Sequence, residues 1–365
     1  MTQVKIRRIG VLTGGGDCPG LNAVIRSVVK TAIHDYGIEV TGIKDGFLGL
    51  IEDRMISLGN DDVSNILTLG GTILGTSNRA NPFSFTVKEG DARIKRDVSA
   101  RVVENYEKRG LDGLICIGGD GTLSVARDFL ERGLRIVGVP KTIDNDLSET
   151  DLTFGFDTAV ANATDAIDKI HTTAQSHHRV MVVETMGRYA GWLALYAGLA
   201  GGGDIILIPE IPFEMKSVIR AIRERVKRGK RSSIVIVAEG AKPLGGDVVV
   251  KKLVEGSFEP IRLGGIGSKL SEEIERLTGI ESRAIVLGHI QRGGSPTAFD
   301  RILATRFGNE AVNLMVKKKN GLMVNLKGDK LASVAIADAV GKLKLVPLVS
   351  PLLASARSIG ISFGD

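Results

Sequence analysis

RIVGVPKTIDND, residues 135–146, joins an apolar run directly to a lysine, a threonine and two aspartates. Strands of a parallel sheet covered on both faces read as nearly continuous apolar runs, so we predict a buried strand over residues 135–139. The two acids then lie just past its carboxyl end. Carboxylates that are clustered or buried cost free energy, so a pair of them at a strand end indicates a functional site.

The same arrangement occurs twice more, nearer the N-terminus. The run at residues 111–117 leads into GGDGT (118–122), and the run at 9–12 leads into TGGGD (13–17). Glycines let backbone amides approach a phosphate closely, a helix start adds partial positive charge, and an aspartate can hold Mg²⁺. Ligands of open α/β sheets bind at the carboxyl ends of strands, so the three turns predict one site for a metal-bound polyphosphate.

Each turn also has a purely structural interpretation. TGGGD is neither a Walker loop nor a complete Gly-x-Gly-x-x-Gly fingerprint, and by itself it is equally compatible with an ordinary tight turn. Asp120 can support its own turn, and the acids of PKTIDND can bond their own backbone amides. The recurrence of the pattern at three strand ends, with a lysine beside the last pair of acids, favours phosphoryl transfer.

Short β-branched runs alternate with helical patterns along most of the chain. Further strands are predicted at residues 39–43, 179–183, 205–208, 233–237 and 284–287. Helices are predicted at residues 19–36, 97–109, 122–132, 157–174, 188–200, 214–228 and 267–277, with Thr122 as the N-cap of the third. The alternation predicts an α/β fold whose parallel strands are covered by helices.

The length of 365 residues fits two domains better than one core. We predict two doubly wound, mainly parallel-sheet, Rossmann-like domains with the active site between them. The first is expected over residues 1–155 plus about 291–342, and the second over 156–290 plus about 343–365. Residues 148–157 are the expected first crossover and residues 291–296 the expected return.

Composition excludes several classes of protein. Aromatic residues make up only 4% of the chain, which argues against stacking platforms for single-stranded nucleic acid, and the net charge of +6 is spread along the sequence. The two cysteines have no metal-ligand spacing. No segment approaches the roughly 18 apolar residues of a membrane span, so we expect no nucleic-acid or membrane partner and a cytoplasmic location.

Basic residues at later strand ends suggest an anionic substrate. Guanidinium groups bind phosphate as forks, and a carboxylate can accept from sugar hydroxyls. A sugar-phosphate pocket is therefore predicted from Arg179, Arg188, Glu239, Arg283, His289 and Arg292.

Taken together, these motifs closely resemble those of the 6-phosphofructokinase family. They are TGGGD, GGDGT, PKTIDND, ETMGRYAG (184–191), AEG (238–240) and VLGHIQRGGSPTAFDRILA (286–304), and the resemblance runs from about residue 9 to residue 316. It implies that the chain transfers a phosphoryl group, with Mg²⁺, to the 1-hydroxyl of fructose 6-phosphate, giving fructose 1,6-bisphosphate in glycolysis. The first predicted domain would hold the phosphoryl donor and the second the sugar phosphate.

The resemblance also implies roles for single residues. Asp144 would be the catalytic base, assisted by Arg188 and Lys141, and Asp120 would be the metal-associated acid. Nucleotide contacts would come from Gly16, Arg79, Gly119, Asp120, Gly121 and Thr122. Sugar-phosphate contacts would come from Thr142, Asp144, Met186, Gly187, Arg188, Glu239, His289 and Arg292. In a dimer or tetramer with shared active sites, the sugar phosphate would also be reached from a neighbouring subunit by Arg179 and Arg283.

Two departures from the family pattern affect donor and regulation. In ATP enzymes of the bacterial allosteric type the positions of Gly121 and Lys141 are both glycine, whereas pyrophosphate enzymes have aspartate and lysine. Gly121 leaves room for a nucleotide, so ATP is favoured and pyrophosphate is the alternative. Arg26 matches an effector-site arginine, but Lys30 replaces a second one, and a phosphate fork loses geometry with lysine. That regulation is therefore not carried over.

A nonenzymatic sugar-phosphate sensor is a third possibility. A sensor has no need of a catalytic base, so the presence of Asp120, Asp144 and Arg188 counts against it. Related kinases of lipids and of nicotinamide dinucleotide share a turn like GGDGT but lack TIDND and GHIQRGG.

Overall fold

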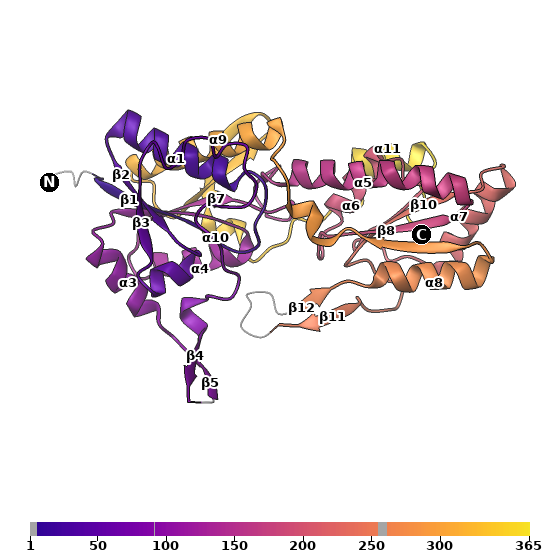
Figure 1. Ribbon diagram of the computed structural model, residues 1–365, viewed down its shortest axis with the longest axis horizontal. Coiled ribbons are helices and arrows are strands. Elements are labelled where there is room, and N and C mark those ends of the chain that lie inside the picture. The colour runs from indigo at the N-terminus through magenta and orange to yellow at the C-terminus, as the bar shows by residue number, and fades with distance from the viewer. Residues whose placement is uncertain (1–5, 91, 255–260) are drawn as a thin grey trace.

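The computed structural model describes residues 6–90, 92–254 and 261–365. The chain forms two lobes that lie side by side along its longest axis (Figure 1). Each lobe is built on its own sheet, a seven-stranded one and a four-stranded one. The predicted α/β class with two mainly parallel sheets is confirmed, whereas the predicted domain limits stay a prediction.

The seven-stranded sheet has the order β15-β14-β7-β6-β1-β2-β3. Its five inner strands run parallel, and β3 and β15 join antiparallel at the edges. The bounds are β1 Arg8–Thr13, β2 Glu39–Ile43, β3 Met55–Leu58, β6 Gly113–Gly118, β7 Ile136–Pro140, β14 Leu322–Lys327 and β15 Lys330–Ala335.

Successive residues of these strands pack against opposite helix layers. Ile115 and Ile117 of β6 belong to the same hydrophobic cluster as α1 (Leu21–Tyr36) and α9 (Ala298–Val316). Leu114 and Cys116 belong to a second cluster, on the other face. Side chains alternate between the two faces of a strand, so a fully apolar strand is covered on both sides. The second layer contains α2 Phe47–Ile51, α3 Ser99–Lys108, α4 Asp120–Leu130 and α10 Ile336–Ala339.

The four-stranded sheet has the order β13-β8-β10-β9, with all strands parallel. Its strands are β8 Val180–Thr185, β9 Ile205–Leu207, β10 Ser233–Ala238 and β13 Ser282–Val286. One face is covered by α5 Phe156–His177 and α6 Trp192–Ala200, and the other by α7 Met215–Lys227 and α8 Ile266–Thr278. Near the C-terminus, Ser362 forms a bridge with Ile205 of this sheet.

Smaller elements lie outside the two sheets. The hairpin β4–β5 projects from the large lobe, and the hairpin β11–β12 lies beneath the region between the lobes (Figure 1). Their bounds, with those of the remaining helices, are η1 Pro82–Ser84, β4 Phe85–Glu89, β5 Ala92–Arg96, β11 Val250–Leu253, β12 Ile261–Leu263, η2 Gly288–Arg292 and α11 Pro351–Ser358. Among the described residues, no helix is both long and apolar enough to cross a membrane.

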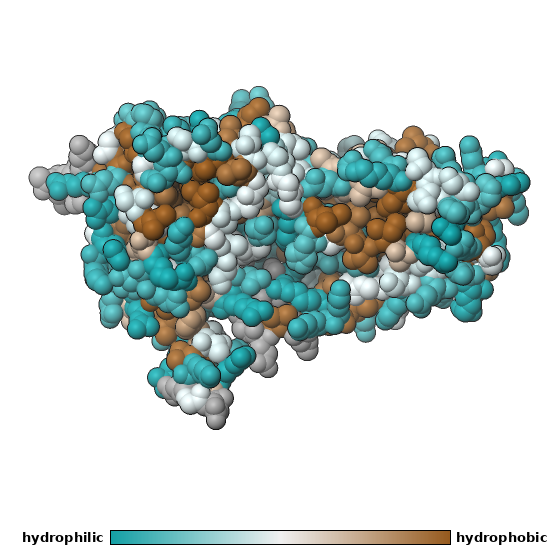
Figure 2. Space-filling view, in the orientation of Figure 1, coloured by the Kyte–Doolittle hydropathy of each residue, from teal (hydrophilic) through white to brown (hydrophobic). Residues whose placement is uncertain are grey.

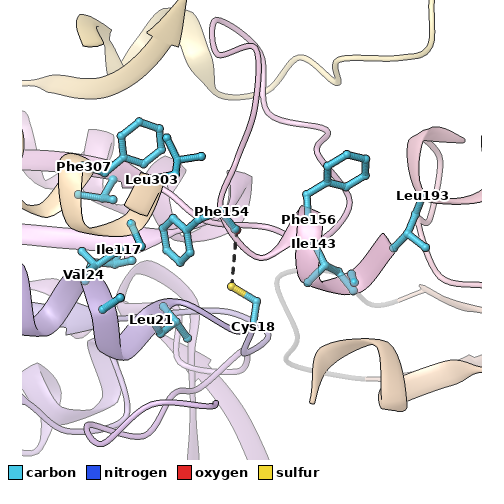
Figure 3. Close-up of a cluster of buried hydrophobic side chains, with 14 of the residues drawn as sticks. Cys18, Leu21, Val24, Ile117, Ile143, Phe154, Phe156, Leu193, Leu303 and Phe307 are labelled. Carbon is cyan, nitrogen blue, oxygen red and sulfur yellow. Dashed lines mark hydrogen bonds between the residues drawn. The ribbon is translucent and has the colours of Figure 1, made fainter. Parts of the chain in front are cut away.

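The two lobes share one hydrophobic cluster (Figure 3). Phe154 and Phe156, on the segment that enters α5, are almost completely buried. The thiol of Cys18, just before α1, donates to the carbonyl of Phe154 over 3.8 Å. Close packing of this kind has little tolerance for displacement, so it fixes how the strand ends of one lobe face those of the other.

Two predicted helix starts were wrong. The helix predicted from residue 188 begins at Trp192, because Gly187 and Arg188 have φ of 131° and 53° and form a turn. The helix predicted with Thr122 as N-cap begins at Asp120, with Gly119 as the N-cap. Asp120 therefore lies in the first turn of α4, where a negative charge is favoured by the helix dipole.

Candidate active site

A cleft of about 1040 Å³ lies between the lobes. The carboxyl ends of β1, β6 and β7 line it on one side, and the segments that follow β8, β10 and β13 line it on the other. This is where open α/β sheets bind ligands. The predicted residues that line it are Gly16, Arg79, Gly119, Asp120, Gly121, Thr122, Lys141, Thr142, Asp144, Met186, Arg188, Glu239, His289 and Arg292. Gly187 was also predicted; it is not among the lining residues, but it lies in the chain between Met186 and Arg188, which are.

The two glycine turns of the large lobe pack against each other through Thr122. A Cβ at Gly14 would lie 2.6 Å from Thr122 Oγ1, and one at Gly118 would lie 2.3 Å from its Cβ. The N–H of Gly14 also donates to the carbonyl of Ile117 over 2.9 Å. No side chain fits at these positions, so both turns need glycine for close packing.

Cations adjoin the first glycine turn. The Lys141 ammonium donates to the carbonyl of Gly16, and Lys141 is only 3% exposed. Arg292 Nη1 donates to the carbonyl of Asp17 over 2.9 Å, and it would lie 3.0 Å from a Cβ placed on Gly16. Arg292 belongs to the predicted sugar-phosphate set, yet it touches the turn predicted for the donor. The two predicted sets therefore meet.

Asp144 lines the cleft and is buried, with an exposed fraction of 5%. Its N–H donates to Thr142 Oγ1 over 3.0 Å, and the next residue, Asn145, has a left-handed φ of 51°. Among the described residues, Asp144 Oδ1 has no hydrogen-bond partner. A buried carboxylate oxygen in that state costs free energy, so it points to a function.

On the opposite side of the cleft, the N–H of Arg188 donates to Glu239 Oε1 over 3.2 Å. A Cβ at Gly240 would lie 1.8 Å from the carbonyl of Arg188, so only glycine fits there. Burial, and next the charge of Asp144, raise the pKa of Glu239 to about 7. The Arg188 guanidinium lies 5.8 Å from the ring of Tyr189.

Arg179 and Arg283 do not line this cleft. They lie at the amino-terminal ends of β8 and β13, and both pair with Glu281, at 2.8 Å and 2.5 Å. The cleft is at the carboxyl ends of these strands, so both arginines lie outside the cleft of their own chain. Their role in a neighbouring subunit stays a prediction.

The cleft also contains residues that the sequence analysis missed. Glu184, at the end of β8, accepts from the N–H groups of Gly265 and Gly267, over 3.0 Å and 2.8 Å respectively, and so fixes the start of α8. Glu184 could have been predicted from the sequence, because an acidic residue at the end of a strand was the pattern that identified Asp120 and Asp144. Nothing in the sequence pattern indicated several other residues of the cleft wall, among them Thr76, Ser77, Lys251, Lys252, Arg262, Gly341 and Leu343.

The acidic residues of the cleft suit a hard cation held together with phosphate. Asp120, Asp144 and Asp146 all line it, and Mg²⁺ prefers oxygen ligands. Asp120 Oδ1 accepts from the N–H of Gly341 over 2.6 Å. Within the described part of the chain, no three acid, histidine or cysteine side chains converge on one point. Of these acids, Asp120 is the one that the sequence analysis predicted to hold Mg²⁺.

Comparison with known proteins places this geometry in a family. The family model described as Phosphofructokinase matches residues 8–315. The chain is 52% identical, over 99% of both sequences, to ATP-dependent 6-phosphofructokinase 2 of Clostridium perfringens. It is also 52% identical to the pyrophosphate–fructose 6-phosphate 1-phosphotransferase of Amycolatopsis methanolica, over 93% of this chain and 96% of that one.

A solved structure agrees. The crystal structure of Pichia pastoris phosphofructokinase in the T-state matches with a TM-score of 0.78 and 32% identity. The match covers 92% of this chain and 35% of that longer one. With the family model spanning both lobes and the cleft between them, this chain belongs to the phosphofructokinase family.

Proposed function

We propose that this protein transfers the γ-phosphoryl group of ATP to the 1-hydroxyl of fructose 6-phosphate, giving ADP and fructose 1,6-bisphosphate. The observation that carries the proposal is the buried Asp144, whose Oδ1 has no hydrogen-bond partner among the described residues although it lines the cleft. A substrate hydroxyl is the missing partner. A nonenzymatic sensor would gain nothing from holding a carboxylate in this costly state.

In the proposed reaction, Asp144 accepts the proton of the sugar 1-hydroxyl while the oxygen of that hydroxyl bonds to the γ-phosphorus of ATP. The bond between the γ-phosphorus and the oxygen that bridges it to the β-phosphate breaks, and ADP leaves. Lys141 and Arg188 also line the cleft, and they would offset the charge of the transferring group. Glu239 and His289 would receive the sugar hydroxyls, and Arg292 its phosphate.

The donor would lie along the glycine turns, with its phosphates near Gly16, Gly119 and the start of α4, and with Arg79 beside it. Asp120 would hold Mg²⁺ through its carboxylate, directly or through water. When bound, Mg²⁺ neutralises phosphate charge and helps to align the phosphoryl group. Thr122 packs beneath the turns and would keep their backbone amides in place.

The choice of ATP over pyrophosphate rests mainly on Gly121. Relatives with equal identity to this chain carry names of both kinds, so overall similarity does not decide the donor. Gly121 lies in the cleft wall beside Asp120, where a larger acidic side chain would crowd and repel nucleotide phosphates. Lys141 contacts the turn at Gly16 and is compatible with either donor.

The proposed enzyme is a homo-oligomer, a dimer or tetramer, that works in the cytoplasm, where both proposed substrates are found. Hydrophobic patches on the faces of both lobes support association (Figure 2). Exposed apolar side chains include Ile302 at 61% and Phe299 at 43%. Arg179 and Arg283 would then reach a neighbour's sugar-phosphate pocket.

Initial-rate assays with fructose 6-phosphate and Mg²⁺ test the proposal, with ATP and pyrophosphate compared at equal free Mg²⁺. We expect turnover with ATP to have a kcat/KM at least about tenfold above that with pyrophosphate, a difference of about 1.4 kcal/mol. A preference for pyrophosphate would reverse the donor assignment. Absence of turnover with both donors would favour the sensor.

A further inference from the structure

A segment near the C-terminus, residues 341–346, contributes Gly341 and Leu343 to the wall of the cleft and contacts both lobes. We refer to it as the strap. The N–H of Gly341 donates to Asp120 Oδ1 over 2.6 Å, and Leu343 forms an antiparallel bridge with Leu147, just past the TIDND turn. At its other end, the N–H of Val346 donates to Glu210 Oε1 over 2.8 Å. The strap thus reaches both lobes.

Lys344, in the middle of the strap, is bonded to the catalytic turn through its side chain. Its ammonium donates to Asn145 Oδ1, to the carbonyl of Thr150 and to the carbonyl of Asp151, each over 2.9 Å. An ammonium has three N–H donors, so all of them are used. Its main-chain N–H donates to the carbonyl of Asp146 over 2.8 Å.

Lys344 also contacts the small lobe through Trp192, the first residue of α6. The indole Nε1 donates to the carbonyl of Lys344 over 2.7 Å, and the ammonium lies 5.6 Å from the ring centroid. Glu210 accepts from Gly191, directly before Trp192, over 2.9 Å and from Val346 over 2.8 Å. The turn that contains Asp144 is therefore connected to the small lobe through one residue, Lys344.

Asn145 is the residue through which this contact acts on Asp144. It is 2% exposed and has a left-handed φ of 51°, a conformation that needs support from the surroundings. Its Oδ1 accepts from the N–H of Thr153 over 3.2 Å and from Lys344. Because Asn145 follows Asp144 directly, holding its side chain fixes the direction of the Asp144 carboxylate.

We infer that Lys344 is a positioning residue for phosphoryl transfer: it holds Asn145, and through it Asp144, against the small lobe. The inference rests on the proposed function of Asp144. Lys344 is not among the residues that line the cleft, so it acts without touching substrate.

The test compares Lys344→Met with Lys342→Met. The two lysines lie in the same segment, but Lys342 is exposed, and the bond from Ser148 reaches only its main-chain carbonyl. A misplacement of about 1 Å in a reacting group can cost 10²-fold, so we expect kcat of Lys344→Met to fall about 10- to 100-fold. Both KM values should stay within about threefold of wild type, and Lys342→Met should match wild type throughout.

A double-mutant cycle identifies the contact. Asn145→Gly removes the side chain but tolerates the left-handed φ, so it should lower kcat to a similar extent, and the double variant should lose little more than the worse single variant. The inference would be overturned if the loss of kcat in the double variant equalled the product of the losses in the two single variants. A normal kcat in either single variant would also overturn it. If Lys344→Met does not fold, Asn145→Gly with an unchanged kcat still refutes it.

Fluorescence supplies a readout that does not depend on activity. Trp192 is the single tryptophan of the chain, so its emission reports the strap directly. We expect Lys344→Met to shift the emission and Lys342→Met to leave it unchanged. An unshifted spectrum in Lys344→Met would contradict the contact itself. An inactive wild type with the expected shift would instead count against the proposed function and leave the contact established.

Discussion

The N–H of Arg188 donates to Glu239 Oε1 over 3.2 Å, joining the turn after β8 to the end of β10 at the wall of the cleft. The bond favours an ionised Glu239, but burial and the nearby Asp144 act more strongly and raise its pKa from 4.5 to about 7. The carboxyl that is proposed to receive sugar hydroxyls therefore titrates near neutral pH in the free protein.

This shift predicts a stability change with a defined sign. The pKa of Glu239 is higher in the folded than in the unfolded protein, so its contribution to stability is complete below pH 4.5 and is lost as pH rises to about 7. Replacing it by Glu239→Gln removes the titration. In urea unfolding, the free energy of unfolding of the Gln variant should rise relative to that of wild type between pH 5 and pH 8. If the difference in unfolding free energy between the two proteins does not change with pH, Glu239 has an ordinary pKa.

Asp144→Asn should reduce kcat by about 10² to 10⁴, the range expected when a general base is lost. The substitution keeps the shape of the side chain, so the protein should remain folded and still bind fructose 6-phosphate. Steady-state kinetics with calorimetric sugar binding measures both effects. Turnover close to wild type would assign the proton transfer to another group.

Gly121→Asp should suppress the use of ATP far more than the binding of sugar. The new carboxylate would lie beside Asp120 in the cleft and face the nucleotide phosphates. Lys141, which already contacts Gly16, can then support some activity with pyrophosphate. The measurement is kcat/KM for both donors in the variant and in wild type. Unimpaired use of ATP by the variant would remove the steric basis of the donor assignment.

Active sites shared between subunits predict complementation. Arg179 and Arg283 lie away from the cleft of their own chain, and each hydrogen bond to a charged group contributes roughly 1.5 to 3 kcal/mol. Removing one arginine should thus weaken fructose 6-phosphate by about tenfold to a hundredfold. Asp144→Asn and Arg283→Ala chains, each impaired by itself at a low fructose 6-phosphate concentration, should recover partial activity when they are dissociated and reassembled together. Verified hybrid oligomers without recovery would mean that Arg283 serves its own chain or none.

The sequence predicted most strands of the two sheets and the glycine turns at the cleft because their signals are local, whereas β3, β14 and β15 were not predicted. Apolar runs such as residues 113–117 are buried on both faces, and each is followed at once by its glycine turn. Asp120 and Asp144 meet in one cleft because parallel strands present their carboxyl ends at the same edge.

What the sequence did not predict depends on distant contacts or on backbone conformation. The turn at Arg188 looked like the start of a helix, because a left-handed φ leaves no mark on the apolar periodicity. Lys344 was missed because its partners, at residues 145, 150 and 151, lie almost two hundred residues earlier. Arg179 and Arg283 lie at the amino-terminal ends of β8 and β13, so the chain direction already places them away from the cleft of their own chain.

Phosphorus NMR of a reaction mixture tests the central claim, that Asp144 directs the γ-phosphoryl group of ATP to the 1-hydroxyl of fructose 6-phosphate. The mixture contains ATP, Mg²⁺ and fructose 6-phosphate with either wild type or Asp144→Asn. With wild type we predict a new sugar 1-phosphate resonance that grows in step with ADP, and with the variant a rate lower by about 10² or more. Release of inorganic phosphate while the sugar stays unchanged, or equal rates for the two proteins, would contradict it.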